Sequence, residues 1–357
     1  MDQFPLPPQI VLDRLREGIV IPAHPLALTS ERAFDERRQR ALTRYYHAAG
    51  AGGIAVGVHS TQFEIRRPEH GLFKPVLELA AETISACDAA TGRQTVRIAG
   101  ITGRTQQALE EARFAVERDY HAGLVSLSAF KGAGDQAMID HCRAVACEIP
   151  LIGFYLQPSA GGRLLTKAFW RRFVEIPNVI AIKIAPFNRY QTLDVLHAVA
   201  ESGRADSIAL YTGNDDNIVA DLLTEYVISD GQKMISLRIV GGLLGHWAYW
   251  TQKAVAILDQ CRALRGQASI PANLLTLGEQ ITDCNAAVFD AAHQFAGLIP
   301  GVNEVLRRQG LMESTLSLKV EETFSPNQLD EIDRVYRAYP HLTDDDFVRD
   351  NLDQWLS

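Results

Sequence analysis

The sequence of 357 residues contains 47% hydrophobic and 22% charged residues, the composition of a globular protein with a sizeable core. Its net charge of −8, with basic and acidic residues interspersed, indicates that nucleic acid is not a partner. The five cysteines are scattered and form no CxxC pair, which favours reduced thiols and a cytoplasmic location. No apolar run approaches about 18 residues and no signal peptide is recognisable, so we expect no membrane association.

Short apolar runs alternate with segments of helical periodicity through the first three quarters of the chain. This alternation predicts βα units around a parallel sheet. The expected strands cover residues 18–22, 53–58, 95–100, 123–127, 151–155, 179–184, 208–212 and 234–241. The expected helices between and after them cover residues 34–49, 72–90, 105–117, 135–147, 166–175, 189–201, 215–226 and 245–265. Eight such units predict an α/β fold, a (β/α)8 TIM barrel.

A doubly wound open sheet is the competing architecture. It usually carries a glycine-rich phosphate-binding turn after the first strand, and the segment HPLALTSERAF is not such a turn.

The last quarter of the chain has only helical patterns, over residues 274–297, 303–310 and 328–339 and in the tail DDDFVRDNLDQWLS. We therefore expect a barrel with a short N-terminal helix over residues 1–265, and a helical region over 266–357. This region is expected to pack on the outside of the barrel or at a subunit contact. The acidic residues 344–346 are expected to form a solvated loop.

Lys183 stands in the run VIAIKIAP, among β-branched and small apolar residues. Burial disfavours the ammonium form and lowers the pKa of a lysine, which leaves a free amine that can attack a carbonyl. The alternative is a lysine whose stem lies on apolar surface while its amine reaches water. In the barrel hypothesis, Lys183 lies at the C-terminal end of the sixth strand, where active sites of this fold are built.

Tyr155 ends the neighbouring fifth strand, in LIGFYLQP. Strand alternation places Gly153 and Tyr155 on one face, and Ile152 and Phe154 on the other. If the bulky apolar residues pack against the helices, Tyr155 points into the barrel beside Lys183, where its phenol can shuttle protons during imine chemistry. The alternative is a core tyrosine that donates a hydrogen bond to a carbonyl.

Other strand ends supply candidate binding residues. Ser60 and Thr61, after the second strand, are candidates for holding a carboxylate, and His59 beside them is a candidate acid or base. Gly213 after the seventh strand and Gly242 near the end of the eighth allow close approach to a ligand.

Asp215 or Asp216 is expected to cap the helix after the seventh strand. The histidines and carboxylates form no recognisable metal-binding motif, so no metal and no cofactor are expected.

Together these residues resemble the dihydrodipicolinate synthase / N-acetylneuraminate lyase superfamily of pyruvate-dependent aldolases, over roughly residues 15–310. The Tyr-x-x-Pro motif of that family is matched by YLQP at residues 155–158, and its Schiff-base lysine strand by AIK at 181–183. Its carboxylate-binding motif Gly-Thr-Thr-Gly-Glu is matched loosely by HSTQF at 59–63, and its Gly-Asp motif by GND at 213–215. The resemblance implies a (β/α)8 barrel that commonly assembles as a dimer or tetramer.

The chain departs from that pattern at several positions. Gln62 and Phe63 replace the glycine and glutamate of the carboxylate motif, and LSAFK at 127–131 lacks the relay tyrosine found in several members. Ala160 stands where dihydrodipicolinate synthase has an arginine for its second substrate, so true dihydrodipicolinate synthase activity is not expected.

The leading hypothesis is a lyase or aldolase that forms a Schiff base between Lys183 and a 2-oxo acid of the pyruvate type, with Tyr155 as proton shuttle. Ser60 and Thr61, with His59 nearby, would bind the carboxylate. The alternatives are a Schiff-base dehydratase of a keto-deoxy sugar acid, and a catalytically silent barrel that binds a small acid.

Overall fold

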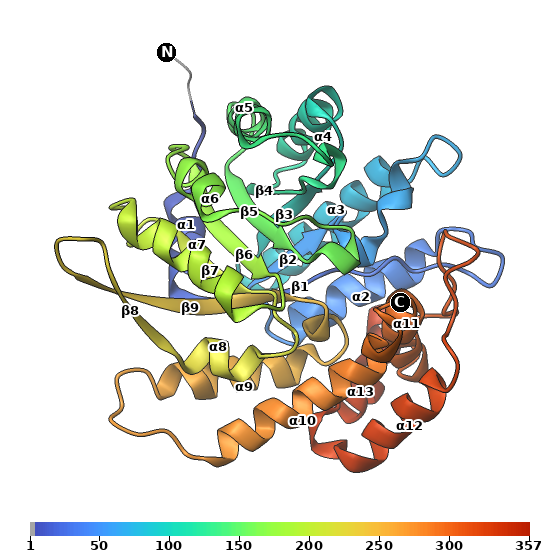
Figure 1. The fold of residues 1–357 in the computed structure, drawn as a ribbon. Coiled ribbons are helices and arrows are strands. Elements are labelled where there is room, and N and C mark those ends of the chain that lie inside the picture. Colours follow the sequence, from blue (N-terminus) through green and yellow to red (C-terminus); the bar gives the residue numbers. More distant parts are fainter. Residues whose placement is uncertain (1–3) are drawn as a thin grey trace.

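The computed structural model describes residues 4–357, except for the side chain of Ala160. Within these residues, eight parallel strands form a barrel surrounded by helices (Figure 1). The predicted (β/α)8 fold is confirmed. The barrel strands are β1 (Val20–Pro22), β2 (Gly53–Val56), β3 (Val96–Ile101), β4 (Ala122–Val125), β5 (Leu151–Leu156), β6 (Val179–Ala185), β7 (Ala209–Thr212) and β9 (Met234–Leu244).

The sheet closes between its first two strands. Neighbouring strands pair in the order β1-β9-β7-β6-β5-β4-β3-β2, and a parallel bridge between Ala23 and Ala55 joins β1 to β2. The His24 N–H donates to the Ala55 carbonyl at 2.9 Å across this junction. Closure leaves no sheet edge unpaired in the barrel wall.

Three of the barrel helices begin after a side chain that accepts a hydrogen bond from one of their free backbone N–H groups. Asp35, Thr166 and Asn188 accept hydrogen bonds from the backbone N–H three residues ahead. The helices are α1 (Gln9–Glu17), α2 (Glu36–Ala48), α3 (Phe73–Thr91), α4 (Thr105–Glu117), α5 (Asp135–Ala146), α6 (Lys167–Phe173), α7 (Arg189–Glu201), α8 (Ile218–Leu223) and α9 (Thr251–Ala263).

Two apolar layers result from the alternation of side chains along the strands. One layer lies inside the barrel and includes Ile98, Ile152 and Tyr211; the other lies between the strands and the surrounding helices. Helix α1 adds Leu15 to the inner layer, and the Tyr211 hydroxyl donates to the Leu15 carbonyl at 2.8 Å. Helix α1 therefore covers the end of the barrel opposite the C-terminal ends of the strands.

The expected helix over residues 215–226 is shorter than predicted. Helix α8 ends at Leu223, and β8 (Glu225–Ser229) then pairs antiparallel with the first half of β9. This hairpin projects from the barrel at the left of Figure 1. Its turn is closed by Asp230, which accepts from two N–H groups, and by Gly231 at a φ of 98°.

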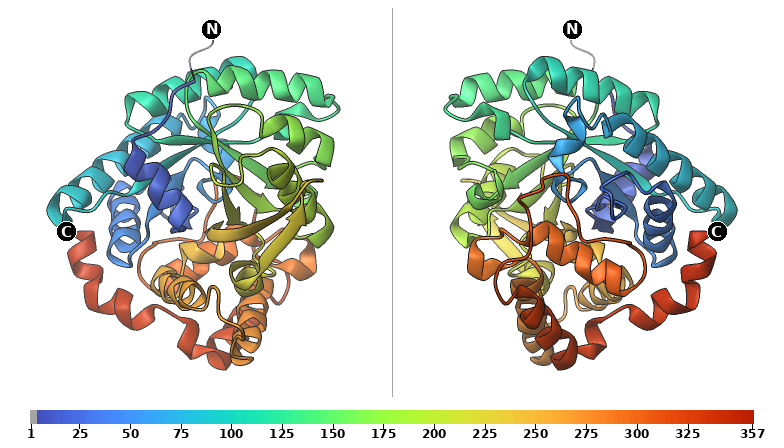
Figure 2. Two further views of the ribbon diagram at one scale, coloured as in Figure 1. Left: turned by 90° about the vertical axis from the view of Figure 1, so that its left-hand side faces the viewer. Right: turned by 90° about the vertical axis from the view of Figure 1, so that its right-hand side faces the viewer.

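The C-terminal region is helical in the described residues, as predicted. Its orange and red helices lie alongside the barrel and across one of its ends (Figure 2). They are α10 (Asn273–Val288), α11 (Leu298–Arg308), α12 (Gln328–Ala338) and α13 (Asp345–Leu356).

The prediction that residues 344–346 form a solvated loop is wrong for Asp344. This carboxylate is buried and accepts from the Tyr45 hydroxyl at 2.7 Å and from the N–H groups of Gln252 and Lys253 at 2.6 and 3.1 Å. It therefore satisfies the free N–H groups at the start of α9 from a distant part of the chain. Residues 345 and 346 open helix α13.

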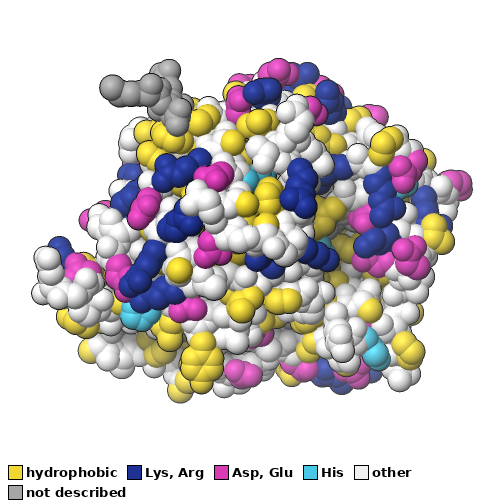
Figure 3. Space-filling model, turned by 45° about the horizontal axis from the view of Figure 1, so that its top comes forward, with side chains coloured by type: hydrophobic (Ala, Val, Ile, Leu, Met, Phe, Trp, Pro, Cys, Tyr) yellow, Lys and Arg dark blue, Asp and Glu magenta, His cyan; other side chains and the backbone are white. Residues whose placement is uncertain are grey.

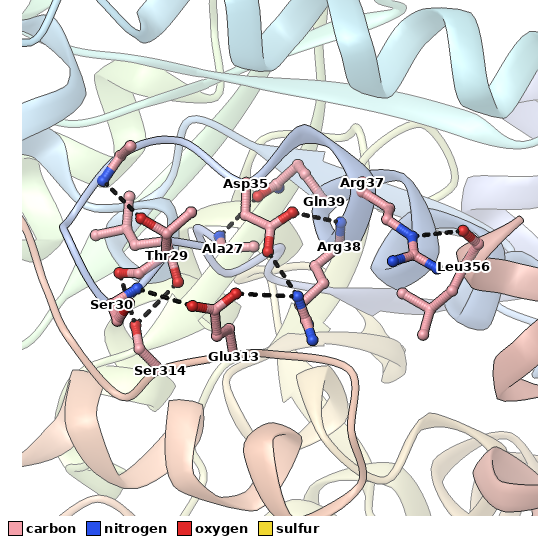
Figure 4. A network of polar contacts seen from close by, with 12 residues as sticks. Ala27, Thr29, Ser30, Asp35, Arg37, Arg38, Gln39, Glu313, Ser314 and Leu356 are labelled. Carbon is pink, nitrogen blue, oxygen red and sulfur yellow. Dashed lines mark hydrogen bonds and ion pairs between the residues drawn. The ribbon is translucent and has the colours of Figure 1, made fainter.

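A polar network attaches the C-terminal region to the segment before α2 (Figure 4). Glu313 accepts from the Ser30 N–H at 3.1 Å and pairs with Arg38 at 3.2 Å. Ser314 donates to the Leu28 carbonyl at 2.9 Å. The C-terminal region is thus bound to the first βα unit, in addition to its chain connection to α9.

Basic and acidic side chains are mixed over the face shown in Figure 3, in keeping with the interspersed charges of the sequence. In the part of the chain that the structure describes, no helix has the length and apolar character needed to span a membrane.

Candidate active site

Lys183 lies inside the barrel near the C-terminal end of β6, as predicted, and is 9% exposed. Its stem packs against β7, because a Cβ added at Gly213 would lie 2.7 Å from Lys183 Cε. Its amine lies 4.5 Å from the centre of the Phe154 ring. Burial lowers the pKa of Lys183, while the charge of Asp215 acts in the opposite direction. The lysine is therefore a buried amine and not a surface residue that reaches water.

Asp215 borders the same chamber as Lys183 and is also 9% exposed. Its Oδ1 accepts from the His246 N–H at 3.0 Å. Burial raises the pKa of Asp215, and both this hydrogen bond and the charge of Lys183 reduce the rise. The expectation that Asp215 or Asp216 caps the next helix is wrong, since Asn217 stands at the start of α8 and no side chain caps it.

Tyr155 points away from the chamber, so the predicted orientation is wrong. Its hydroxyl donates to the Leu165 carbonyl at 3.0 Å, and its ring lies 5.5 Å from that of Trp170 on α6. In the register of β5 and β6, Phe154 and not Tyr155 is opposite Lys183. Burial raises the pKa of Tyr155 to about 12. The phenol is therefore a buried contact between strand and helix, and a phenylalanine ring occupies the position beside the amine.

Helix α6 explains why Tyr155 does not point into the barrel as predicted. It contributes bulky Trp170 and Phe173 to the outer layer, and these rings cover the outward face of Gly153. A Cβ at Gly153 would lie 2.7 Å from the Phe173 ring, so the small residue belongs against the helix. The register between β5 and β6 also shifts between Leu151 and Ile152, and Ile180 lies in the inner layer.

The loop after β2 contains the short helix η1 (His59–Thr61). His59 and Ser60 border the chamber, and the Ser60 hydroxyl donates to the Ala23 carbonyl at 2.7 Å. Thr61 is fully buried, where its hydroxyl donates to the His24 carbonyl at 2.6 Å and accepts from the Gly57 N–H at 3.0 Å. Thr61 thus closes the turn and does not border the chamber, contrary to the prediction.

His59 is electrically neutral in this position at neutral pH. Burial, with the charge of Lys183 nearby, lowers the pKa of His59 to about 4. An imidazole with such a pKa is a poor proton donor at neutral pH.

The two predicted glycines have different surroundings. Gly213 borders the chamber. At Gly242 an added Cβ would lie 2.7 Å from the Trp247 ring and 2.8 Å from Leu244, both in the outer layer. The prediction that Gly242 binds substrate is therefore corrected to a packing role. Among residues 4–357, no three His, Cys, Asp or Glu side chains are grouped so that they could hold a metal ion.

The chamber is small, with a volume of about 70 Å³. Its wall is mostly apolar. Its lining includes Ala23, Val58, Phe154, Leu156, Ala185, Phe187, Phe289, Phe295, Leu298 and Val302, with the polar residues His59, Ser60, Gln157, Lys183 and Asp215. The rings of Phe187 and Phe295 meet edge to face at 5.7 Å. Both residues have positive φ, 52° and 68°, a strained conformation that the surrounding contacts must maintain.

A larger basin of about 620 Å³ adjoins the chamber and shares His59, Phe295 and Leu298 with it. Lys131 and Lys319 contribute positive charge to its lining. The shared residues thus separate a small apolar space around Lys183 from a wider, more polar space.

The C-terminal region contributes to the site in a way that sequence reasoning missed. Asn285 on α10 donates to the Asp215 carbonyl at 2.7 Å, and its Oδ1 accepts from the Tyr249 hydroxyl at 2.6 Å. Asp290 supports the segment that carries Phe295 by accepting from the Gly297 N–H at 3.0 Å. No short motif marks these residues, because their partners are far away in the sequence.

The loop that carries Gly213 and Asp215 is also supported from within the barrel. Asn214 accepts from the Phe187 N–H at 3.0 Å and donates to buried Asp221 at 3.0 Å. Asp221 also accepts from the Thr212 hydroxyl at 2.6 Å. These bonds hold the ends of β6 and β7 in one arrangement.

No protein-family model matches the sequence. One curated relative, 4-hydroxy-tetrahydrodipicolinate synthase from Nitratidesulfovibrio vulgaris, is 24% identical over 165 residues, which are 45% of this chain and 53% of the relative. The chain thus matches about half the length of that relative.

Solved structures match over nearly the whole chain. Dihydrodipicolinate synthase from Cyanidioschyzon merolae with lysine bound is 18% identical with a TM-score of 0.71, covering 90% of this chain and 98% of that one. N-acetylneuraminate lyase from Fusobacterium nucleatum is 13% identical with a TM-score of 0.69, covering 91% and 99%. YagE from Escherichia coli K12, in complex with pyruvate, is 17% identical with a TM-score of 0.70, covering 90% and 97%.

These similarities confirm the resemblance predicted from the sequence: the chain has the fold of the dihydrodipicolinate synthase and N-acetylneuraminate lyase superfamily.

Proposed function

We propose that this protein is a lyase or aldolase that forms a Schiff base between Lys183 and a 2-oxo acid. The observation that carries the proposal is the buried Lys183 amine at the C-terminal end of β6, in a chamber with few other polar groups. Burial lowers the pKa of Lys183 and so increases the fraction of nucleophilic amine near neutral pH. The protonated imine then acts as an electron sink for making or breaking a bond at the neighbouring carbon.

The comparisons support the same reaction class. Two similar solved structures, YagE and dihydrodipicolinate synthase from Acinetobacter baumannii, contain pyruvate. We extend that ligand class to this chain because its fold places Lys183 at the strand end where the family motif has the reactive lysine. Assembly into dimers or tetramers, which the resemblance implies, is likewise proposed.

The chamber lining supports a substrate with an apolar substituent and not a polyhydroxylated sugar acid. Phe154, Phe187, Phe289 and Phe295 border the space and cannot accept hydrogen bonds from sugar hydroxyls. A hydroxyl buried without a partner costs roughly 1–3 kcal/mol. The Ser60 hydroxyl can donate to the carboxylate only if it leaves the Ala23 carbonyl.

Borohydride trapping with pyruvate, read by intact mass, tests the Schiff base. We expect one reduced adduct on the wild type and on Lys74→Ala, which removes an exposed lysine, and none on Lys183→Ala. Where the trapping rate rises with pH, the midpoint of that rise should lie below the pKa of an ordinary lysine, about 10.4. An absent adduct on the wild type would support the silent binding barrel, and an unchanged adduct on Lys183→Ala would overturn Lys183 as the nucleophile.

A matched pair of 2-oxo acids tests the substrate preference. In 2-oxobutanoate a methyl group occupies the place of the hydroxyl in 3-hydroxypyruvate, so the two differ little in size. We expect 2-oxobutanoate to be trapped at a concentration roughly 10-fold lower. The reverse order would favour the sugar-acid dehydratase.

A further inference from the structure

We propose that Asp215 carries the proton during imine formation at Lys183, in the place where a phenol was expected. This inference rests on the proposed Schiff-base function and adds a named proton donor to it. Phe154, which has no proton to transfer, lies against the amine, and the Tyr155 hydroxyl is bound to the Leu165 carbonyl on the other side of the strand. A proton carrier must therefore come from another element.

The loop after β7 brings Asp215 to the chamber that contains the Lys183 amine. Gly213 packs on the Lys183 stem, and Asp215, two residues later, borders the same chamber. Oδ1 is held by the His246 N–H, and the backbone carbonyl by Asn285. These two bonds hold the Asp215 carboxylate at the wall of the chamber that also contains the Lys183 amine.

Few other titratable groups face Asp215. They are Lys183 and His59 in the chamber, exposed Asp216 beside it in the chain, and His246 and Tyr249 on the segment after β9. The His246 ring lies within hydrogen-bond distance of Asn285 Oδ1 at 2.7 Å, and the Tyr249 hydroxyl donates to the same oxygen at 2.6 Å. His59 is neutral at neutral pH, whereas burial raises the pKa of Asp215 toward the range in which a carboxyl can donate.

Lys183 and Asp215 together can complete imine formation with the release of one water molecule. The neutral Lys183 amine attacks the carbonyl carbon of the 2-oxo acid, while protonated Asp215 gives its proton to the carbonyl oxygen. The resulting carboxylate takes a proton from the nitrogen of the tetrahedral adduct and returns it to the departing hydroxyl, which leaves as water. The product is a protonated imine next to the Asp215 carboxylate, whose charges compensate each other.

A purely electrostatic role for Asp215 predicts the opposite result from a proton-carrying role. The Asp215 charge raises the pKa of Lys183. Removal of that charge therefore increases the fraction of free amine near neutral pH, and imine formation becomes faster if nothing else changes. Loss of a proton carrier makes it slower, by roughly 10²-fold or more.

The test is rapid-quench borohydride trapping with pyruvate between pH 5.5 and 9 on the full chain. Asp215→Asn keeps the acceptor for the His246 N–H and removes the transferable proton; Asp216→Asn is the matched control at the exposed neighbour. We expect Asp215→Asn to form the adduct roughly 10²-fold more slowly across this range, and Asp216→Asn to match the wild type. Formate, a diffusible carboxylic acid, should partly restore the rate of adduct formation in Asp215→Ala. It should not change that rate in Asp216→Ala.

An Asp215→Asn rate equal to or faster than that of the wild type overturns the inference and leaves the Schiff base intact. Absence of a wild-type adduct overturns the proposed function itself. If the Asp215 variants do not fold, the pH dependence of the wild-type trapping rate provides the test. A rate that rises and then falls with pH supports proton transfer by the pair Lys183 and Asp215, and a monotonic rise contradicts it.

Discussion

Gly213→Ala perturbs Lys183 through a single methyl group. The added Cβ would lie 2.7 Å from Lys183 Cε and 2.7 Å from Ala185 Cβ. Carbon atoms in ordinary contact are roughly 3.5–4.0 Å apart, so the lysine stem must move by about 1 Å. The flexible lysine stem can move aside, whereas the Ala185 Cβ is fixed to β6, so that contact is relieved only by a shift of the backbone.

A shift of about 1 Å at the reacting group is expected to slow imine formation by roughly 10²-fold. Overpacking should also lower the free energy of unfolding by about 1–3 kcal/mol. Trapping kinetics with pyruvate and denaturant unfolding measure the two effects separately. Gly134→Ala is the control, since nothing lies within 4 Å of a Cβ at that position. Wild-type trapping kinetics and stability in Gly213→Ala would refute the close packing of Gly213 on the lysine stem.

Two further substitutions test buried polar groups on the described structure. Tyr155→Phe leaves the Leu165 carbonyl without its donor and should lower the free energy of unfolding by about 1–3 kcal/mol. The rate of borohydride trapping should be unchanged. A slower trapping rate at unchanged stability would support Tyr155 as a proton shuttle. Asp344→Ala removes the acceptor for two N–H groups at the start of α9 and for a tyrosine hydroxyl, and should cost about 3 kcal/mol in urea unfolding. Asp346→Ala, at an exposed neighbour, should change stability by less than about 0.5 kcal/mol, and equal effects of the two variants would contradict the assigned role of Asp344.

The C-terminal region has a direct connection to the site. Phe289, Phe295, Leu298 and Val302 border the chamber, and Asn285 holds the backbone of the loop that carries Asp215. This region therefore determines both the size and the polarity of the space around Lys183. In the proposed reaction it acts as the wall that excludes water from the imine.

Local patterns in the sequence were sufficient for the barrel. Buried parallel strands consist of nearly continuous apolar runs, and the helices between them have a clear period of 3.6 residues. Each barrel strand was therefore found within a few residues of its observed bounds. The hairpin of β8 and β9 was missed, although EYVIS and MISLR flank the turn residues Asp230 and Gly231, because the first residues of β8 were assigned to the preceding helix.

The inward position of Lys183 also followed from the sequence, because a charged side chain on a strand that is apolar on both faces has few places to lie. The sequence did not show which side chains of β5 point into the barrel. Gly153 and Tyr155 face α6 because that helix brings Trp170 and Phe173 to the interface, and those rings need the space that a glycine leaves.

The sequence by itself thus determined the fold and the position of the lysine, since both depend on periodicities that are local in the chain. Tertiary structure alone decided which groups surround the amine. Phe154 is opposite Lys183 through strand register, Asp215 reaches the chamber through the β7 loop, and Phe295 comes from the C-terminal region more than 100 residues later. Packing between elements that are distant in the sequence determines such neighbours, and a pattern within one segment contains no information about them.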